Sequence, residues 1–370
     1  MRRVKIDKVA SALRRLDVAH ISQEALVSDA VVARPGYAVA CRVLEQKSVY
    51  GELENQHGRN VKLYKGDVIA GVLGERKALH GHAGVVPSKL SVGDGLHMLN
   101  LGGVIGLASS SHASVGAPLR LELLGALLAF PVFGSRAGVP AHLGMAAIPG
   151  GEPSPRVPVV FISGTCMNAG KTLAAAEIVR ALVGAGLRVG AAKLTGVAAS
   201  KDTMAMMDCG AAASLTFVDA GLPSTTPATA PAAARAVLAG LAAEDVDVIV
   251  AELGDGLLGE YGVLAILEDP AIAALPAVHV CCAADPVGAY GAAGVFSGRL
   301  GRSPDVFSGP VTDNAVGVLA IARLMDRPAL NARRDAPALG ATVLAALSQL
   351  RAPALLTQDA GAPPQPHLHA

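Results

Sequence analysis

The chain has 370 residues, a length typical of two or three domains rather than one. Hydrophobic residues make up 52% and charged residues only 16%, so the chain can bury a large core and is not intrinsically disordered as a whole. A formal net charge of +1 gives no indication of a nucleic-acid-binding protein. The basic cluster in residues 1–15 is typical of a solvated surface.

The cysteines and the apolar runs indicate the compartment. The five cysteines show no Cys-x-x-Cys spacing, which argues against a disulfide framework or a zinc site. The longest apolar run, residues 123–134, is too short to span a bilayer and contains a proline. Since the N-terminus also lacks the apolar segment of a secretory signal, we expect a cytoplasmic protein without membrane or nucleic-acid partners.

The N-terminal part of the chain predicts mainly short strands. Residues 1–30 favour a short helix followed by a lead-in segment. From residue 31 to about residue 107, short runs of Val, Leu and Ile alternate with Gly and Pro, which is typical of a small barrel or sandwich. Residues 114–128 favour a helix, and a Gly/Pro-rich linker follows. We place the boundary near Pro153, so that residues 31–152 form a β-rich, barrel-like domain.

The pattern changes after Pro153. Continuous apolar runs, typical of strands buried on both faces, alternate with helical segments. This alternation predicts an α/β domain over residues 153–350, with a parallel, doubly wound sheet. We expect the tail, residues 351–370, to be disordered. The predicted strands lie within residues 157–164, 187–196, 246–256, 276–286 and 304–314.

A glycine-rich loop follows the first of these strands. The stretch SGTCMNAGKTL, residues 163–173, ends in Gly-Lys-Thr like a phosphate-binding loop, but five residues separate Gly164 from Gly170 instead of the usual four. A strand precedes it and a helix follows, which argues against the alternative of an unoccupied glycine turn. Backbone N–H groups and the helix N-terminus can bind phosphates, Lys171 can reach the β- and γ-phosphates, and the Thr172 hydroxyl can ligate Mg²⁺. The predicted nucleotide-binding residues of the loop are Gly164, Thr165, Asn168, Ala169, Gly170, Lys171, Thr172 and Leu173.

The lengthened loop, GTCMNAGKT, resembles that of dethiobiotin synthetase, G-T-D-T-x-V-G-K-T, and of the related cobyrinic acid amide synthases. It is also similar to the loop of the D-glutamate N-acetyltransferase family, roughly G-T-D-C-x-V-G-K. The resemblance covers roughly residues 157–326 and not the N-terminal half. It implies a P-loop NTPase-like fold in which the longer loop still binds phosphates.

Two further segments match in type and place. The segment AAKLTG stands where dethiobiotin synthetase-like enzymes have K-P-V-x-[ST]-G, so the resemblance puts Lys193 beside the substrate and the transferred phosphoryl group, where a cation stabilises developing charge. The segment ELGDG matches E-G-A-G-G, so Glu252 is expected to anchor Mg²⁺ with Thr172. Strand ends meet at one sheet edge, so we predict Lys171, Lys193 and Glu252 as the catalytic residues, with Asp255 nearby.

The chain also departs from these families. Cys166 stands where the families have an Asp that helps to hold the metal; we expect a small apolar filler there rather than a reactive thiol. The KLTG segment lacks the Pro, and Leu253 replaces the Gly after the Glu. The loop lacks the additional Lys of partition-type ATPases, which gives no support to a nucleotide-sandwich dimer. These differences argue against dethiobiotin synthesis itself.

Weaker candidates surround the loop. The acid-bearing segment after the second strand, residues 201–211, can meet Mg²⁺ or a polar substrate, and residues 218–226 can bind a carboxylate or form a plain polar loop. Asn314, at the end of the fifth strand, can hydrogen-bond adenine. His80 and His82 lack a third ligand at a telling spacing, and His367 and His369 lie in the tail. The predicted substrate residues are Thr195, Gly196, Asp202, Ser224 and Thr225, with Asp208 and Asp219 as further acids.

Three functions remain open. The first is an ATP- and Mg²⁺-dependent ligase or synthetase that activates a small carboxylate or amine by phosphoryl transfer, with ATP or another nucleoside triphosphate as cofactor. The second is an N-acyltransferase that holds acyl-CoA on the loop. The third is a switch NTPase or assembly factor whose N-terminal domain binds a partner. A homodimer is possible in each case.

Overall fold

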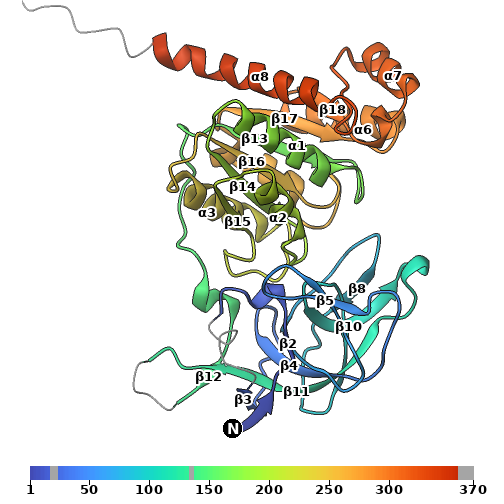
Figure 1. The fold of residues 1–370 in the computed structure, drawn as a ribbon, viewed down its shortest axis with the longest axis vertical. Helices are drawn as coiled ribbons and strands as arrows, with labels where there is room; N and C mark the ends of the chain where they lie inside the picture. Colours follow the sequence, from blue (N-terminus) through green and yellow to red (C-terminus); the bar gives the residue numbers. More distant parts are fainter. Residues whose placement is uncertain (17–23, 133–136, 357–370) are drawn as a thin grey trace, which may run out of the picture.

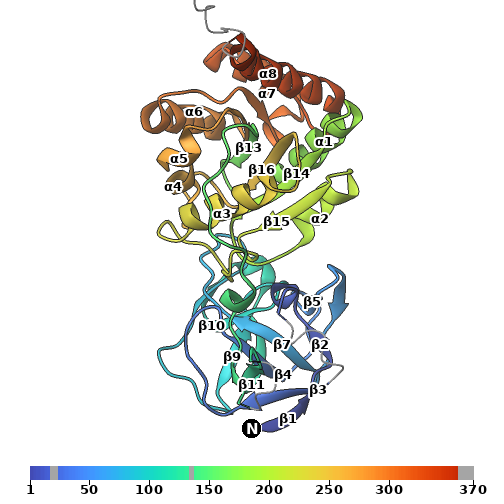
Figure 2. The ribbon, with the colours of Figure 1, turned by 90° about the vertical axis from the view of Figure 1, so that its left-hand side faces the viewer.

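The computed structural model describes residues 1–16, 24–132 and 137–356. An N-terminal β-rich domain and a C-terminal α/β domain stack end to end, as Figures 1 and 2 show from two sides. The predicted fold class is therefore confirmed: a parallel sheet with helices on both faces follows a domain built almost entirely of strands.

Five strands of the N-terminal domain form a closed ring. β11 pairs with β4, β4 with β7, β7 with β10, β10 with β9, and β9 with β11 again. Only the contact between β7 and β10 is parallel. A closed ring leaves none of its strands with an unpaired edge, so this is a small barrel. Its strands are β4 (Ala38–Val43), β7 (Val68–Leu73), β9 (Gly95–Met98), β10 (Val104–Ser111) and β11 (Leu119–Ala129).

Alternate residues of these strands fill the barrel. Side chains of a β-strand point to opposite faces in turn, and the inward set here is apolar and fully buried. On β11, for example, Leu119, Leu121 and Leu123 are buried while Arg120 is exposed. The barrel core also contains Val39, Cys41, Val43, Ile69, Leu73, Leu96, Met98 and Ile105.

Short elements surround the barrel. β1 pairs antiparallel with β3, β3 extends the sheet beside β11, and β5 pairs with β6 in a separate ribbon. The described residues of this domain also include the 3₁₀ segments Ser11–Leu13, Ala113–Val115 and Leu143–Ala146. The strands are β1 (Arg2–Lys5), β2 (Lys8–Val9), β3 (Glu24–Ser28), β5 (Glu52–Glu54), β6 (Asn60–Lys62), β8 (His82–Val85) and β12 (Val139–Pro140).

Two predicted helices in this part of the chain are wrong. Residues 1–16 form β1, β2 and a 3₁₀ turn, because long-range pairing with β3 and β7 outweighs the local helical pattern. Residues 119–129 form β11, the longest strand of the described barrel, instead of a helix. Leu and charged residues alternate at its start with a period of two, and the apolar run that follows is buried on both faces, which imitates a helix in sequence.

The C-terminal sheet has six strands, all parallel, in the order β15-β14-β16-β13-β17-β18. Its central strands are buried throughout, as expected for strands covered on both faces. The sequence analysis missed only β15, a half-buried edge strand. The strands are β13 (Val159–Gly164), β14 (Val189–Thr195), β15 (Ala213–Thr216), β16 (Val248–Leu253), β17 (Ala277–Cys282) and β18 (Val306–Ser308).

Helices cover both faces of this sheet. α1 (Lys171–Gly184), α2 (Lys201–Asp208) and α8 (Ala336–Leu356) pack on one face. Residues 351–356, assigned above to a disordered tail, belong to α8, whereas residues 357–370 with His367 and His369 lie outside the described residues. The other face carries α3 (Ala230–Ala242), α4 (Val263–Leu267), α5 (Pro270–Ala273), α6 (Pro286–Leu300) and α7 (Ala315–Met325). In the described parts of the chain, no helix has the length and apolarity needed to cross a membrane.

Polar contacts join the two domains. Arg14, beside the barrel, forms an ion pair with the buried Asp219 and donates to the Thr216 hydroxyl over 3.1 Å. Asp219 therefore serves as a counter-ion for an arginine of the other domain. Glu54 accepts from the backbone N–H groups of Ser200 at 2.8 Å and Lys201 at 2.9 Å. One apolar cluster also spans the interface, with Leu13 and Leu143 packed near Phe217 and Val218.

We predict that Asp219→Ala lowers the free energy of unfolding by about 3 kcal/mol, because removal of one partner leaves a largely desolvated arginine without its counter-ion. Thermal denaturation followed by circular dichroism measures the change. Asp29→Ala serves as the control, since this carboxylate is 79% exposed and its pair with Arg2 spans 3.7 Å. Equal effects of the two substitutions would contradict a stabilising interdomain pair.

Candidate functional site

The lengthened loop connects β13 to α1, as predicted. Gly170 directly precedes the helix with φ 87°, a left-handed conformation that favours glycine. A Cβ atom on Gly164 would lie 3.0 Å from Cδ of Lys171, so this glycine leaves the space through which the lysine side chain passes. Asn168 also has a positive φ of 63°, a left-handed conformation that asparagine adopts more readily than most residues.

Lys171 projects from the first turn of α1. Its side chain is largely buried, and Nζ donates to the backbone oxygen of Cys166 over 2.7 Å. Burial lowers the pKa of Lys171, although Glu252 acts in the opposite direction. Among the described residues, no carboxylate lies within 4.0 Å of this ammonium group, so its charge is available to an anion on the loop.

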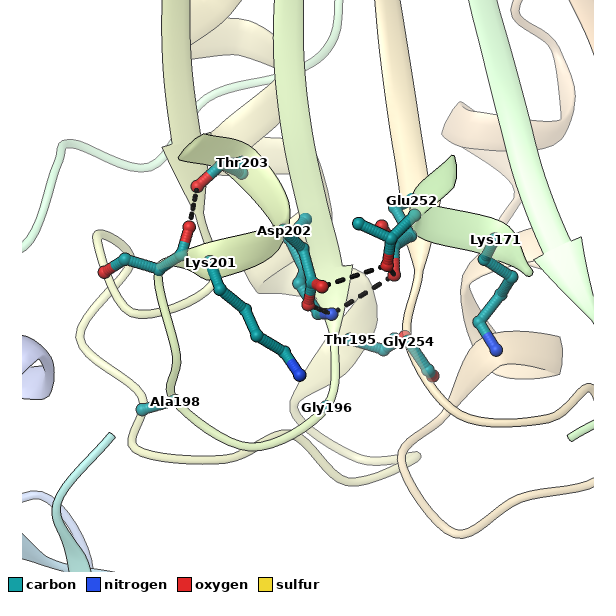
Figure 3. Close-up of polar contacts among 12 residues, drawn as sticks. Lys171, Thr195, Gly196, Ala198, Lys201, Asp202, Thr203, Glu252 and Gly254 are labelled. Atoms are coloured by element: carbon teal, nitrogen blue, oxygen red, sulfur yellow. Dashed lines mark hydrogen bonds and ion pairs between the residues drawn. The ribbon is translucent and has the colours of Figure 1, made fainter. Parts of the chain in front are cut away.

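A cluster of charges lies beside the loop. Lys193, at the end of β14, forms ion pairs with Asp202 at the start of α2 and with Glu252 on β16; the Nζ–Oε1 distance to Glu252 is 3.3 Å. The hydroxyl of Thr172 lies 2.9 Å from Oδ1 of Asp202 and 3.3 Å from Oε1 of Glu252. Figure 3 shows Asp202 and Glu252 directed toward one another, with Lys171 on the far side of Glu252.

The protonation states follow from burial and mutual attraction. Burial alone would lower the pKa of Lys193, but Glu252 and Asp202 outweigh it and raise the pKa well above its usual value. Burial opposes ionisation of Asp202 as well, yet Lys193 holds the pKa of this carboxyl below its usual value. Burial raises the pKa of Glu252. Lys193 is therefore a cation held in place by its two carboxylates.

The donor set fits a magnesium ion. Two carboxylates and one hydroxyl are the hard oxygen ligands that Mg²⁺ prefers, and they lie next to the residues expected to hold phosphates. Oε2 of Glu252 is buried and has no hydrogen-bond partner among the described residues. Thr172, Glu252 and Asp202 are thus the residues that would hold the ion. Asp202 supplies a carboxylate that the loop itself lacks, because Cys166 occupies the position of the usual Asp.

The loop and the charge cluster form one wall of a cavity of about 520 Å³. The other wall comes from the N-terminal domain, and the sequence analysis assigned these residues to no site. Nothing in the local pattern identifies them, because they reach the site only through the docking of the barrel. They include Tyr50, Glu54, Arg76, His80 and Asn100, while Tyr261 joins them from the α/β domain.

Ten of the candidate residues line the cavity. They come from the loop, from the ends of β14 and β16, and from α2, and they converge as expected at the carboxyl ends of neighbouring strands. The residues are Asn168, Gly170, Lys171, Thr172, Leu173, Lys193, Gly196, Asp202, Glu252 and Asp255. Gly164, Thr165 and Ala169 belong to the loop but do not line the cavity.

Other candidates have structural contacts instead. The Thr195 hydroxyl donates to the Gly254 carbonyl over 2.8 Å. Thr225 accepts from the Gly196 amide at 3.0 Å and donates to the Tyr261 carbonyl at 2.8 Å. Asn314 caps α7 through the Val316 amide and does not line the cavity.

The remaining candidates, Asp208, Ser224 and Cys166, also do not line the cavity. Asp208 is exposed at the end of α2, and Ser224 pairs through its backbone with Val197. Cys166 packs against the apolar cluster of the α1 face. His80 lines the cavity, but the described residues contain no group of three or more His, Cys, Asp or Glu side chains that could hold a metal ion.

Comparisons with known proteins find similarity among solved structures. No family model and no curated protein matches the chain, so the resemblance to dethiobiotin synthetase and the N-acetyltransferases gains no support from them. The 54 kDa protein of the signal recognition particle from Aeropyrum pernix, in complex with GDP, is 14% identical over 55% of this chain and 51% of that chain, with a TM-score of 0.36.

Two other solved structures are similar to about the same extent. A DUF1611 family protein from Anabaena variabilis is 15% identical over 55% of this chain and 63% of its own, with a TM-score of 0.36. The cell division protein FtsY from Thermotoga maritima is 18% identical over 53% and 70%, with a TM-score of 0.35. This chain thus spans about half the length of the signal recognition particle protein.

We predict that Lys193→Met makes stability strongly pH-dependent. Without the cation, Asp202 and Glu252 are adjacent buried carboxylates, so their folded pKa values rise above the unfolded ones. Stability is then greatest below the unfolded pKa values, about 4, and falls as the pH rises through the folded ones. At neutral pH the loss is about 3–5 kcal/mol.

Thermal melts between pH 5 and pH 8 measure this dependence. In the wild type, the raised pKa of Glu252 and the lowered pKa of Asp202 act in opposite directions, and Lys193 keeps its charge throughout. Lys89→Met, at an exposed site, is the control. Parallel pH profiles for Lys193→Met and the wild type would disprove the charge compensation.

Proposed function

We propose that this protein is an enzyme that binds ATP or another nucleoside triphosphate with Mg²⁺ on the loop and transfers the γ-phosphoryl group to a small molecule. The cavity between the domains carries the proposal: the loop residues that we expect to bind phosphates form one wall, and polar and aromatic side chains of a second domain form the other. A cavity of about 520 Å³ is within the range of small-molecule sites. Nucleotide binding alone does not require a second wall. A chamber with two walls can also hold a second substrate.

Each residue has a role consistent with its contacts. The loop amides and Lys171 hold the β- and γ-phosphates, and the ammonium group neutralises the charge that develops during transfer. Thr172, Asp202 and Glu252 hold Mg²⁺, which supplies further neutralisation of phosphate charge when bound. Lys193 contacts both carboxylates, so we assign it a positioning role, in place of direct contact with the transferred group.

The reaction balances without a further cofactor. An oxygen of the acceptor, such as a carboxylate, forms a bond to the γ-phosphorus while the bond from this phosphorus to the bridging oxygen breaks, and the nucleoside diphosphate leaves. In a ligase, an amine then displaces phosphate from the activated carbon. The second domain forms one wall of the cavity and so limits the access of water, which would otherwise hydrolyse the activated acceptor.

Lys171→Ala tests the nucleotide site. We expect calorimetric titration of ATP, GTP and ADP with Mg²⁺ to show at least about tenfold weaker binding in this variant, because a charge-assisted contact with phosphate is lost. Lys89→Ala is the matched control and leaves the affinity unchanged. Nucleotide binding of equal strength in both variants would exclude the loop as the phosphate site. Titration of acetyl-CoA in the same series tests the N-acyltransferase alternative.

A switch or assembly NTPase is the second candidate, and one contact favours it. The amides of Ser200 and Lys201, at the start of α2, bind Glu54 of the N-terminal domain, and the next residue, Asp202, contacts Thr172 of the loop. A nucleotide that displaces Asp202 would therefore move a helix that also holds the other domain.

Hydrogen exchange distinguishes the two functions. For a switch, we expect a non-hydrolysable ATP analogue to change protection both in residues 200–208 and in the barrel segment around Glu54. Glu54→Gln should abolish the change in the barrel segment and keep the change in residues 200–208, because the substitution weakens the link between the domains. An unchanged barrel segment in the wild type would favour the small-molecule enzyme.

A further inference from the structure

Arg76 is a buried cation on the barrel wall of the cavity. It follows β7, lines the cavity and is only 4% exposed. Its guanidinium group contacts neutral acceptors: the Leu99 carbonyl, the His80 carbonyl at 3.1 Å and the Tyr50 hydroxyl at 3.4 Å. These contacts fix the position of the group without neutralising its charge.

No counter-ion compensates this charge. Within the described residues, no carboxylate lies within 4.0 Å of Arg76, and its Nε is buried without a hydrogen-bond partner. Burial of an unpaired charge is costly, and an anion bound at this position would offset that cost. The arrangement contrasts with Arg14 at the same interface, which has Asp219 as its partner.

The neighbours of Arg76 do not offset its charge. His82 lies nearby, and burial and then Arg76 lower its pKa to about 4, so the imidazole is neutral at pH 7. Tyr50 contributes an aromatic ring, with the Arg76 guanidinium carbon 5.8 Å from the ring centroid. Tyr50 also adopts a positive φ of 55°, a conformation that is costly for a tyrosine and is common at binding sites.

Two oxyanions can reach this cavity: a phosphate of the nucleotide and a carboxylate of the second substrate. On the opposite wall, Lys171, the loop amides and Lys201 already offer positive charge and hydrogen-bond donors to the phosphates. Tyr50 and Tyr261, by contrast, give the Arg76 region apolar surface suited to the carbon skeleton of an organic molecule. The guanidinium fork also matches the two oxygens of a carboxylate.

We propose that Arg76 binds a carboxylate group of the second substrate, so that the molecule held opposite the phosphate loop is a small carboxylic acid. This inference rests on the proposed function, because it names the substrate class of the same cavity. It adds a specificity-determining residue from the domain that the loop motif does not cover.

Calorimetry on the full chain tests this assignment. Succinate and glutarate are titrated, with succinamide and glutaramide as neutral analogues of matched size, into protein saturated with Mg²⁺ and a non-hydrolysable ATP analogue, and into nucleotide-free protein. We expect at least one dicarboxylate to bind and both diamides to fail. Arg76→Met should weaken dicarboxylate binding by at least about tenfold and leave nucleotide affinity unchanged.

Two further variants sharpen the test. Lys77→Met removes a neighbouring exposed cation outside the cavity and should change neither affinity. Arg76→Lys keeps the charge but not the fork, so we expect a weaker loss for dicarboxylates and unchanged nucleotide affinity. If the thermal melt shows that Arg76→Met does not fold, the dicarboxylate affinity of Arg76→Lys tests the assignment instead.

The outcomes separate this inference from the proposed function. Absence of dicarboxylate binding to the wild type, or equal binding of the diamides, overturns the assignment of Arg76. Weaker nucleotide binding in Arg76→Met also overturns it, because the anion at Arg76 is then a phosphate. Dicarboxylate binding without nucleotide binding would support the carboxylate site and reject the proposed nucleotide-dependent reaction.

Discussion

The charge of Lys193 is the constraint on which the site depends. An ammonium group this deeply buried requires counter-ions, and the chain supplies one from 9 positions away and one from 59 positions away in sequence. Asp202 brings the start of α2 to the end of β14, and Glu252 comes from the adjacent β16. Thr172 then joins this cluster to the loop. The start of α2 also binds Glu54 of the N-terminal domain. One segment therefore both compensates the charge of Lys193 and attaches the barrel.

The C-terminal part of this arrangement was predictable from sequence because it follows from local rules. Apolar runs that end in Gly164, Lys193 and Glu252 predict parallel strands whose carboxyl ends meet, and the structure brings these ends together. The pairing of Lys193 with both carboxylates was not predictable. The position of a residue at a strand end places it at one edge of the sheet but does not determine the rotamer of its side chain. β11 was misread because its apolar stretch has no decisive period.

The N-terminal wall could not have been found in the same way. Tyr50 and Arg76 occur in short barrel segments without a motif, and their relevance arises only where the barrel docks on the α/β domain. A buried, unpaired arginine is also not visible in sequence, since burial and the absence of a counter-ion are both tertiary properties. The interface therefore contributes residues to the site as well as stability to the protein.

The contacts between the domains have a consequence for how the protein reaches its native state. Arg14 and Thr216 are 202 positions apart, and Glu54 and Ser200 are 146 apart. Contacts of such high sequence separation pay the largest loop-closure entropy and form late. The barrel and the parallel sheet each have their own apolar core, so both can fold before they meet. We therefore expect the chamber to form last, so that a newly made chain can have two folded domains before it has a complete site.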